Sequence, residues 1–274
     1  MREFDEIIAE TMGSTVLGSY PVGGGCIHEA RCLELADGRK LFVKSGAKAH
    51  LLNAERRGLE LLAPHIRVPA LLAWGEGWLA LEWMEFRPLG RDGFLDLGKQ
   101  LAALHSVTAD AHGLDHDNFI GSTPQINRRS ASWSEFYQNC RLLPQLELAA
   151  RNRHVLPVSK ILSAVAKLLA DHEPRPALLH GDLWSGNTAA LPDGKAVVFD
   201  PAPYFGDPET DLAMLELFGG NLTNEFLEGY GQVSKERERR RPLYDLYHAL
   251  NHLNLFGSGY AGMVRHCLSG IGVE

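Results

Sequence analysis

Three polar side chains in the second half of the chain have the types and the spacing that phosphoryl transfer requires. Asp182 and Asn187 lie in the stretch His180-Gly-Asp-Leu-Trp-Ser-Gly-Asn187, and Asp200 follows in Val197-Val-Phe-Asp-Pro201. In phosphoryl transfer one carboxylate orients the attacking hydroxyl, while a carboxamide and a second carboxylate hold Mg²⁺ on the nucleotide phosphates. The sequence therefore predicts Asp182 as the catalytic base, and Asn187 and Asp200 as the metal ligands.

A short hairpin must bring the second carboxylate back to the loop. The segment Leu191-Pro-Asp-Gly194 has the residues of a tight turn, so the chain between Asn187 and Asp200 is predicted to form a hairpin. The two side chains can then share one cation, and hard oxygen ligands of this kind suit Mg²⁺. His180 and Asp211 are expected to be structural, with Asp211 bracing the backbone of the loop.

The N-terminal region offers groups that could hold nucleotide phosphates. The run Gly23-Gly24-Gly25 lies between two predicted strands, where backbone N–H groups can approach a polyanion without interference from side chains. Lys44 ends a third predicted strand and Glu55 lies on the helix predicted after it, so they can form the ion pair that positions phosphates. Each signal alone also fits a surface turn and a solvated pair. The downstream pattern around Asp182 favours the nucleotide site.

A break in the strand pattern at Glu85–Gly90 marks a predicted hinge between two lobes. Before it, Val68–Leu72 and Trp78–Met84 have the composition of strands, the second of them apolar on both faces. We expect an N-lobe over residues 1–86 and a C-lobe over residues 87–274. In a two-lobed kinase the hinge backbone binds adenine. The candidates here are Glu82, Trp83, Met84 and Glu85.

Beyond the hinge, apolar residues recur mainly at helical spacing, with a polar loop expected over Asp115–Arg129. The predicted fold class is α+β: a two-lobed protein-kinase-like fold, with a small lobe of antiparallel sheet plus helix and a larger, mainly helical lobe. The basic run Lys235–Arg241 is interleaved with Glu236 and Glu238, so a solvated helix face or loop is expected there. Helices are expected near residues 4–17, 51–62, 91–107, 132–150, 157–172, 212–218, 224–230 and 242–256, with a short piece to 264.

Composition limits the classes of protein to consider. The 274 residues carry a formal net charge of -7, which gives no electrostatic argument for nucleic acid or an anionic membrane as a partner. No run of about 18 apolar residues occurs, so no membrane span is expected. The first residues lack the basic and apolar regions of a signal peptide. The four cysteines are scattered, which argues against a disulfide framework or a structural metal and indicates a reducing, cytoplasmic location.

These segments together resemble the fructosamine/ketosamine kinase family, within the aminoglycoside-phosphotransferase-like group of the kinase fold. The resemblance extends from the glycine run almost to the end of the chain. Three features distinguish the ketosamine kinases from the rest of that group: Trp184 in the loop His180–Asn187, the segment Leu217–Gly220 and the segment Asn251–Gly257. The segments that carry it are His180–Asn187, Phe199–Ala202, Tyr204–Gly206, Glu209–Met214, Leu217–Gly220, Asn118–Gly121, Thr123–Gln125 and Asn251–Gly257.

The resemblance implies ATP-dependent phosphorylation of the 3-hydroxyl in the sugar part of a fructosamine, ribulosamine or erythrulosamine, as a deglycation repair step. ATP and Mg²⁺ are then the cofactors, and a free or protein-bound ketosamine is the partner. Trp184 should face the acceptor, where its ring could cover the apolar face of the sugar. Polar and aromatic groups on the last long helix suit a pocket wall, although an ordinary half-exposed helix fits equally. The acceptor candidates there are Asn251 and His252.

Other functions stay open. A kinase of the same fold could act on an aminoglycoside or choline hydroxyl, and a non-catalytic nucleotide-binding scaffold is the alternative outside enzymes. The presence of Lys44, Asp182, Asn187 and Asp200 favours an enzyme. Gly181 occupies the position of the protein-kinase loop arginine, which argues against switching by a phosphorylated activation segment.

Cys26, directly after the glycine run, is a candidate redox-sensitive thiol, because nearby backbone N–H groups and a lysine would favour its thiolate. An inert small residue is the alternative at this position. The chain is therefore expected to be a monomer that could form a dimer under oxidising conditions.

Overall fold

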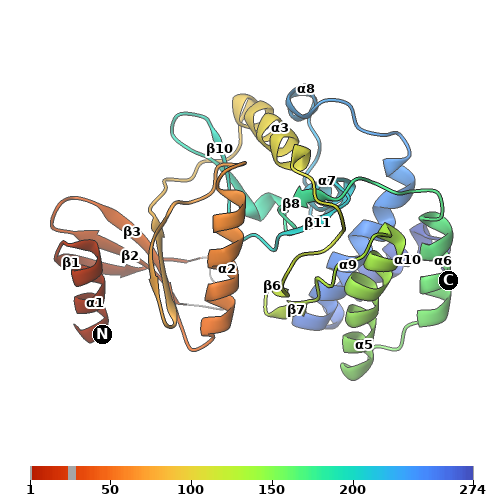
Figure 1. Ribbon diagram of the computed structural model, residues 1–274, viewed down its shortest axis with the longest axis horizontal. Coiled ribbons are helices and arrows are strands. Elements are labelled where there is room, and N and C mark those ends of the chain that lie inside the picture. The colour runs from red at the N-terminus through yellow and green to blue at the C-terminus, as the bar shows by residue number, and fades with distance from the viewer. Residues whose placement is uncertain (1, 24–28, 274) are drawn as a thin grey trace.

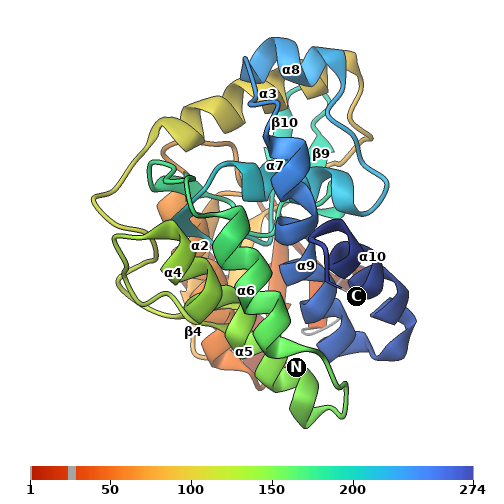
Figure 2. The ribbon, with the colours of Figure 1, turned by 90° about the vertical axis from the view of Figure 1, so that its right-hand side faces the viewer.

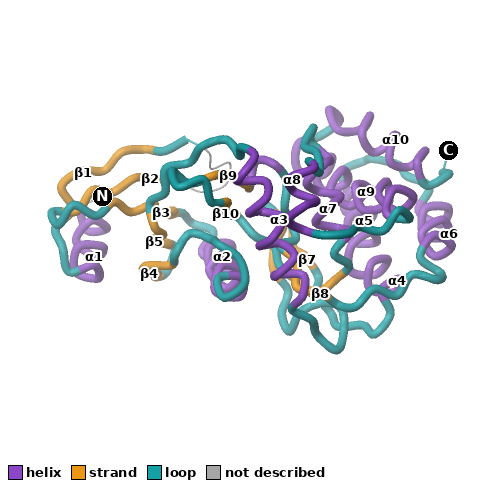
Figure 3. Tube along the Cα trace, turned by 90° about the horizontal axis from the view of Figure 1, so that it is seen from above, coloured by secondary structure: helices purple, strands orange, loops and turns teal. Residues whose placement is uncertain are grey.

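The computed structural model of the chain describes residues 2–23 and 29–273, and these form two lobes (Figure 1). Within those residues the N-terminal lobe contains a five-stranded antiparallel sheet in the order β1-β2-β3-β5-β4. Figure 3 shows the sheet at one end of the molecule and most helices at the other. The strands are β1 (Val16–Pro21), β2 (Glu29–Leu35), β3 (Lys40–Ser45), β4 (Leu71–Gly75) and β5 (Trp78–Glu82).

Alternating apolar residues give the sheet a buried face. Leu33 of β2 and Leu41 of β3 are fully buried and share a hydrophobic cluster with Ile8 of α1 (Arg2–Met12). Because side chains alternate along a strand, these positions all face the same helix. The β2–β3 turn falls at the predicted place, where Gly38 has a φ of +87°, a conformation that favours glycine.

Helix α2 (Ala49–Leu62) joins the sheet to the second lobe. Its buried face belongs to the same hydrophobic cluster as β5. A Cβ at Gly58 would lie 3.2 Å from ring carbons of Pro201 and Pro203. The missing side chain therefore lets α2 lie close to the segment after Asp200, which brings Glu55, about one turn earlier, to the region between the lobes.

The C-terminal lobe is mainly helical (Figure 2), and buried aromatic side chains lie among its helices. Trp133 and Tyr244 are fully buried, and the indole N–H of Trp133 donates to the Tyr244 hydroxyl at 3.1 Å. This contact joins the region of α4 to the long helix α9. The helices are α3 (Arg91–Ser106), α4 (Trp133–Phe136), α5 (Leu143–Arg151), α6 (Val158–Leu168), α7 (Glu209–Leu217), α8 (Asn224–Tyr230), α9 (Arg237–Phe256) and α10 (Ala261–Gly270).

Short antiparallel pairs of strands hold the loops of this lobe. A hairpin interrupts the polar loop that the sequence predicted over residues 115–129, and a second hairpin follows the catalytic loop. The pairs are β6 (Asn118–Ile120) with β7 (Thr123–Gln125), β8 (Ala177–Leu179) with β11 (Tyr204–Gly206), and β9 (Thr188–Ala190) with β10 (Ala196–Val198).

A π-helical segment explains how Pro144 fits inside a nearly continuous helix. The segment Tyr137–Leu142 connects α4 to α5, and Pro144 lies in the first turn of α5. Proline lacks an N–H group and clashes with the carbonyl one turn earlier in a regular α-helix. The wider π turn moves that carbonyl away, so helix continues through the position.

The prediction of a solvated face for the basic run Lys235–Arg241 holds for Lys235, Glu236, Glu238 and Arg239, which are exposed, and is wrong for Arg237 and Arg240. Helix α9 begins at Arg237, earlier than expected, and Arg237 and Arg240 are 5% and 9% exposed. Both nitrogens of the Arg240 fork donate to Glu209 at 2.7 and 2.8 Å, and Arg237 donates to Glu216 at 2.5 Å. Their spacing of three residues places both guanidinium groups on the side of α9 that faces α7. Arg237 and Arg240 therefore join α9 to α7 through ion pairs.

The predicted α+β class, with a small lobe of sheet plus helix and a larger helical lobe, is confirmed. Most predicted helices lie within a few residues of their expected positions, and α10 extends beyond the predicted piece to Gly270. Of the helices in residues 2–23 and 29–273, none is long and apolar enough to cross a bilayer.

Candidate active site

The backbone of the predicted catalytic loop, His180–Asn187, runs from β8 to β9 and ends in a 3₁₀ turn, Ser185–Asn187. Because β8 pairs with β11 and β9 pairs with β10, both ends of the loop are held. Gly181 has a φ of +81°, and a Cβ there would lie 2.0 Å from the carbonyl oxygen of Ala202. No side chain fits here, so an arginine could not replace Gly181 without moving the segment after Asp200.

Asp182 and Asn187 lie together inside this loop. Asn187 is buried, and its Nδ2 donates to the Asp182 backbone oxygen at 2.8 Å and reaches Asp182 Oδ2 at 3.4 Å. The Phe199 N–H donates to the Asn187 carbonyl oxygen at 3.1 Å, so the predicted hairpin does return to the loop. Burial raises the pKa of Asp182 to about 7, the charges of Asp200 and Asp211 add to the rise, and the Asn187 hydrogen bond opposes it. This carboxylate keeps an affinity for protons, as a general base must.

Lys44 joins the two lobes through two carboxylates. Its Nζ lies 2.7 Å from Glu55 Oε1 on α2 and 2.5 Å from Asp200 Oδ1. Burial raises the pKa of Glu55, whereas the Lys44 charge overcomes the effect of burial on Asp200 and holds its pKa below the usual value. Asp200 has a φ of +53°, uncommon for a residue with a side chain, and its carboxylate is 46% exposed. Asp200 therefore faces the space between the lobes while Lys44 and Glu55 are mostly covered.

Asp211 holds the start of the loop from α7. Its carboxylate accepts hydrogen bonds from the backbone N–H groups of His180 at 2.7 Å and Gly181 at 2.9 Å. The His180 ring lies 3.1 Å from the Phe199 carbonyl oxygen, and burial lowers the pKa of this ring. A neutral His180 thus links the loop to the residue before Asp200, while Asp211 fixes the backbone on which Asp182 stands.

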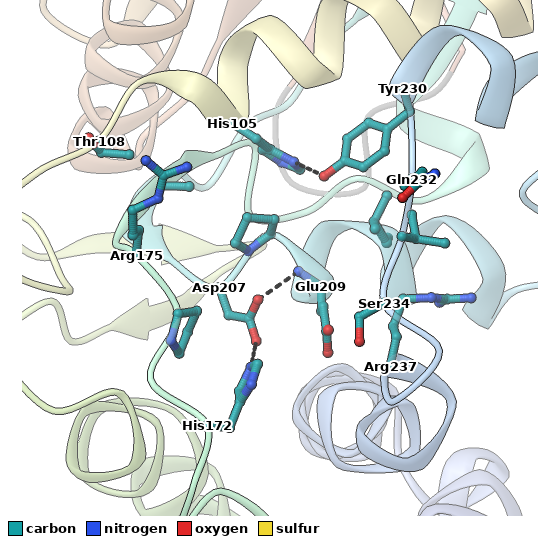
Figure 4. Close-up of a pocket in the computed structure, with 15 residues that line it drawn as sticks. His105, Thr108, His172, Arg175, Asp207, Glu209, Tyr230, Gln232, Ser234 and Arg237 are labelled. Carbon is teal, nitrogen blue, oxygen red and sulfur yellow. Dashed lines mark hydrogen bonds and ion pairs between the residues drawn. The ribbon is translucent and has the colours of Figure 1, made fainter.

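A cavity of about 290 Å³ lies behind this anchor, and Figure 4 shows its lining. The Tyr230 hydroxyl lies 2.8 Å from His105 Nδ1, and His105 Nε2 lies 3.2 Å from Asp211 Oδ2. Burial alone would raise the pKa of Asp211, but the hydrogen bonds from His105 and from the Gly181 N–H lower it. At another part of the lining, Asp207 forms a hydrogen bond with His172 (Figure 4). The cavity wall therefore connects to the catalytic loop through His105.

The predicted hinge follows β5. Glu82 belongs to the sheet, and its carboxylate is occupied by Arg67 at 2.7 and 2.8 Å. Within the described parts of the chain, the backbone of residues 83–86 makes no hydrogen bond to another backbone group. Phe86 stacks on Phe199 with ring centroids 4.8 Å apart. The described residues therefore leave the backbone groups of residues 83–85 free to bind a ligand. The next residue, Phe86, connects this segment to Phe199, which precedes Asp200.

Gly23 is the one residue of the predicted glycine run that the structure describes; it is exposed, and a Cβ there would meet nothing within 4 Å. Gly24, Gly25 and Cys26 lie outside the described residues, as does any contact of theirs.

The acceptor candidates have different surroundings. Trp184, within the loop, is 37% exposed, and its ring contacts Phe218. Phe218 in turn contacts His252 of α9, so Trp184 and His252 border the same surface. Asn251 is buried on another side of α9, where its Oδ1 accepts a hydrogen bond from Gln145 at 3.1 Å. Asn251 therefore holds helices together and does not reach this surface.

A buried network that the sequence analysis missed positions the segment after Asp200. Gln125 Nε2 donates to the Ala202 carbonyl oxygen at 3.0 Å, and Asn118 Nδ2 donates to that of Pro203 at 2.8 Å. The Tyr247 hydroxyl donates to Gln125 Oε1 at 2.8 Å. The available signal was the pair of amides, Asn118 and Gln125, on either side of a short segment with apolar residues, in a region that was predicted to be a polar loop.

The family model described as fructosamine kinase matches residues 1–271 of the chain. A probable ketoamine kinase of Synechocystis sp. is 44% identical over 265 residues, covering 90% of this chain and 89% of the relative. A chloroplastic protein-ribulosamine 3-kinase of Oryza sativa subsp. indica is 38% identical over 277 residues, covering 93% of this chain and 78% of the relative.

Solved structures show the same fold. A crystal structure from Thermobifida fusca YX-ER1, assigned as a fructosamine-3-kinase, superposes with a TM-score of 0.90 at 34% identity and covers 99% of both chains. The choline kinase LicA of Streptococcus pneumoniae superposes with a TM-score of 0.69 at 18% identity, covering 98% of this chain and 99% of that one. At that identity the second likeness speaks for the kinase fold alone.

Proposed function

The chain belongs to the fructosamine kinase family, and from this premise we propose that it transfers the terminal phosphate of ATP to a sugar hydroxyl of ketosamines. Relatives named ketoamine kinase and protein-ribulosamine 3-kinase support this acceptor class. The reaction fits a deglycation repair enzyme, as the sequence resemblance implied. The preferred ketosamine is one of the fructosamine, ribulosamine and erythrulosamine types.

The observation that carries the proposal is the convergence of Asp182, Asn187, Asp200 and Lys44 from three separate elements on one site. Asp182 accepts the proton of the attacking hydroxyl, since its surroundings favour the protonated form that results. Lys44, held by Glu55, binds the nucleotide phosphates. The free backbone of Trp83, Met84 and Glu85 suits the adenine ring.

The donor set between the lobes fits Mg²⁺. Glu55 and Asp200 share a single ammonium group, Lys44, and the negative charge of Asp200 also acts on Asp182, so the site has an excess of negative charge. Within the described residues nothing donates a hydrogen bond to Asn187 Oδ1, which leaves a hard oxygen free. Asn187 and Asp200 would hold the ion, which when bound neutralises the phosphate charge.

A panel of acceptors tests the proposal. Purified protein with ATP and Mg²⁺ is given ribulosamine, erythrulosamine and fructosamine, and in parallel kanamycin and choline, and ADP release and the phosphorylated product are measured. We expect one ketosamine to show the highest kcat/KM. A higher kcat/KM for kanamycin or choline would overturn the acceptor class, and nucleotide binding without turnover on any acceptor would identify a scaffold.

A further inference from the structure

A row of aromatic rings runs from the catalytic loop to the end of α9. Trp184 contacts Phe218 edge to face, with ring centroids 5.7 Å apart. Phe218 lies 4.7 Å from His252, which lies 5.5 Å from Phe256 and 5.0 Å from Tyr260. Phe256 and Tyr260 are 6.0 Å apart, so the last three rings form a triangle. We call these side chains the aromatic row.

The aromatic row is exposed at both ends and uncharged along its length. Trp184 is 37% and Phe256 is 57% exposed, whereas the rings between them are half-buried. His252 Nδ1 donates to the His248 carbonyl oxygen at 2.9 Å, and burial lowers the pKa of His252, which keeps the ring neutral. A contiguous exposed apolar surface marks a binding site more often than single exposed rings do.

The acceptor needs such a surface, and this step rests on the proposed function. In a ketosamine, an amine lies a few bonds from the sugar hydroxyl that reacts, and the amine carries a substituent. With the hydroxyl at Asp182 and the sugar against Trp184, the substituent must leave along the open side of the loop, because Asn187 and Gly181 are buried on the other. The aromatic row leads by ring contacts from the exposed Trp184 to the exposed Phe256.

We propose that Phe256 and Tyr260 form a second acceptor subsite that binds the amine-side substituent of the ketosamine. A protonated amine is attracted to the faces of aromatic rings, and an alkyl or aromatic substituent gains free energy when these rings remove it from water. The substrates favoured by this subsite are ketosamines of alkyl or aromatic amines; the alkyl stem of a lysine side chain is of this chemical type. Because Phe256 is at the exposed end, a long substituent can continue into solvent.

Two acceptors with the same sugar and different amines separate this subsite from the sugar site. The ketosamines of methylamine and hexylamine are compared with wild type and Phe256→Ala, and kcat and KM are measured for each. We expect Phe256→Ala to lower kcat/KM for the hexylamine adduct about 5- to 10-fold more than for the methylamine adduct, mainly through KM. Tyr260→Ala should act in the same direction and Tyr260→Phe should restore the preference, because the ring is retained.

Trp74→Ala is the matched control, since Trp74 is 54% exposed but lies on β4 in the other lobe. It should leave the ratio of the two acceptors unchanged. Equal losses on both adducts in Phe256→Ala, or no loss on either, would overturn the second subsite while the proposed function stands. A wild type that phosphorylates neither adduct, with kanamycin or choline as its acceptor, would overturn the proposed function and this inference with it.

Discussion

Asp182 and Asp211 serve the same loop, and they differ in how many donors reach their carboxylates. Asp211 accepts hydrogen bonds from His105 and from two backbone N–H groups, and these bonds lower its pKa although burial would raise it. From the residues that the structure describes, the Asp182 carboxylate receives a single long hydrogen bond of 3.4 Å from Asn187, and burial raises its pKa to about 7. A carboxylate whose oxygens all accept hydrogen bonds is held in place and has a low affinity for a proton. A buried carboxylate with few hydrogen-bond donors can take a proton from a substrate.

The same contrast extends to the regions around them. On the side of the loop that faces the space between the lobes, which we call the cleft side, Asp200 and Glu55 share one lysine. On the far side, Asp207 accepts from His172 and from the Tyr244 hydroxyl, and Glu209 binds Arg240 through both oxygens. His172, Asp207 and Glu209 lie close enough together to hold a metal ion, but existing donors already occupy these carboxylates. We infer that charge is left uncompensated on the cleft side, where nucleotide and cation can supply the missing partners, and is paired on the far side to hold α7 and α9.

The largest effect is expected for Asp182→Asn. The amide cannot accept the proton of the attacking hydroxyl, so kcat should fall by about two to four orders of magnitude with nucleotide binding retained. The variant should be at least as stable as wild type, because a carboxylate with few donors is replaced by a neutral group of the same shape. Steady-state kinetics, ADP titration and thermal unfolding measure the three quantities. Full activity in Asp182→Asn would refute its role as the base.

Asp211→Asn should have the opposite profile. The amide has one acceptor oxygen, so it cannot bind both backbone N–H groups and His105, and the free energy of unfolding should fall by about 2 to 4 kcal/mol. Because the loop backbone loosens, kcat should fall by about 10- to 100-fold, less than in Asp182→Asn. Urea unfolding and kinetics on the same preparation test this. If the substitution lowers kcat as far as Asp182→Asn while stability is unchanged, Asp211 takes part in the chemistry.

Short-range features of the site could be predicted from the sequence. The turn residues after Asn187 predicted the hairpin that returns Asp200. The pattern around Asp182 favoured an ion pair between Lys44, at the end of a strand, and Glu55 on the following helix, and the two side chains do form that pair. The surroundings of Asn251 could not be predicted. Polar residues such as tyrosine and asparagine occupy buried positions of α9, so the pattern of apolar residues does not indicate which side of the helix faces α5. The burial of Arg237 and Arg240 could not be predicted for a similar reason. A run of charged residues has the composition of a solvated helix face, and Glu216 and Glu209, which pair with these two arginines, lie on another helix.

Asp245 tests whether missing bonds cost stability away from the cleft. It lies on α9, its Oδ1 has no hydrogen-bond partner among the described residues, and burial raises its pKa to about 7, against an opposing effect of Arg241. The folded state thus binds this proton more tightly than the unfolded state does, so stability falls as pH rises from about 4 through 7. Asp245→Asn should remove this penalty and raise the free energy of unfolding at pH 8 by about 1 to 2 kcal/mol, with little change at pH 5.

Urea unfolding of Asp245→Asn and wild type at the two pH values measures this difference, and kcat serves as the control. Asp245 is not part of the cleft, so turnover should stay close to that of wild type. A variant that is destabilised equally at both pH values would mean that the Arg241 contact at 3.5 Å outweighs the missing bonds.

The smallest effect is expected for Tyr230→Phe. This substitution tests whether Tyr230 contributes, through His105, to the position of Asp211. Tyr230 lies 2.8 Å from His105 Nδ1, and when its hydroxyl donates there the His105 proton lies on Nε2, which points at Asp211. Without the hydroxyl the ring keeps its packing, but the imidazole proton is no longer directed to one nitrogen. Stability should fall by about 0.5 to 1.5 kcal/mol and kcat by less than about 3-fold, with KM for ATP unchanged. Unfolding and kinetics of Tyr230→Phe and His105→Ala, alone and combined, measure the coupling between the two residues. If the effects of the two substitutions simply add, Tyr230 acts by packing alone and the chain of hydrogen bonds to the catalytic loop begins at His105.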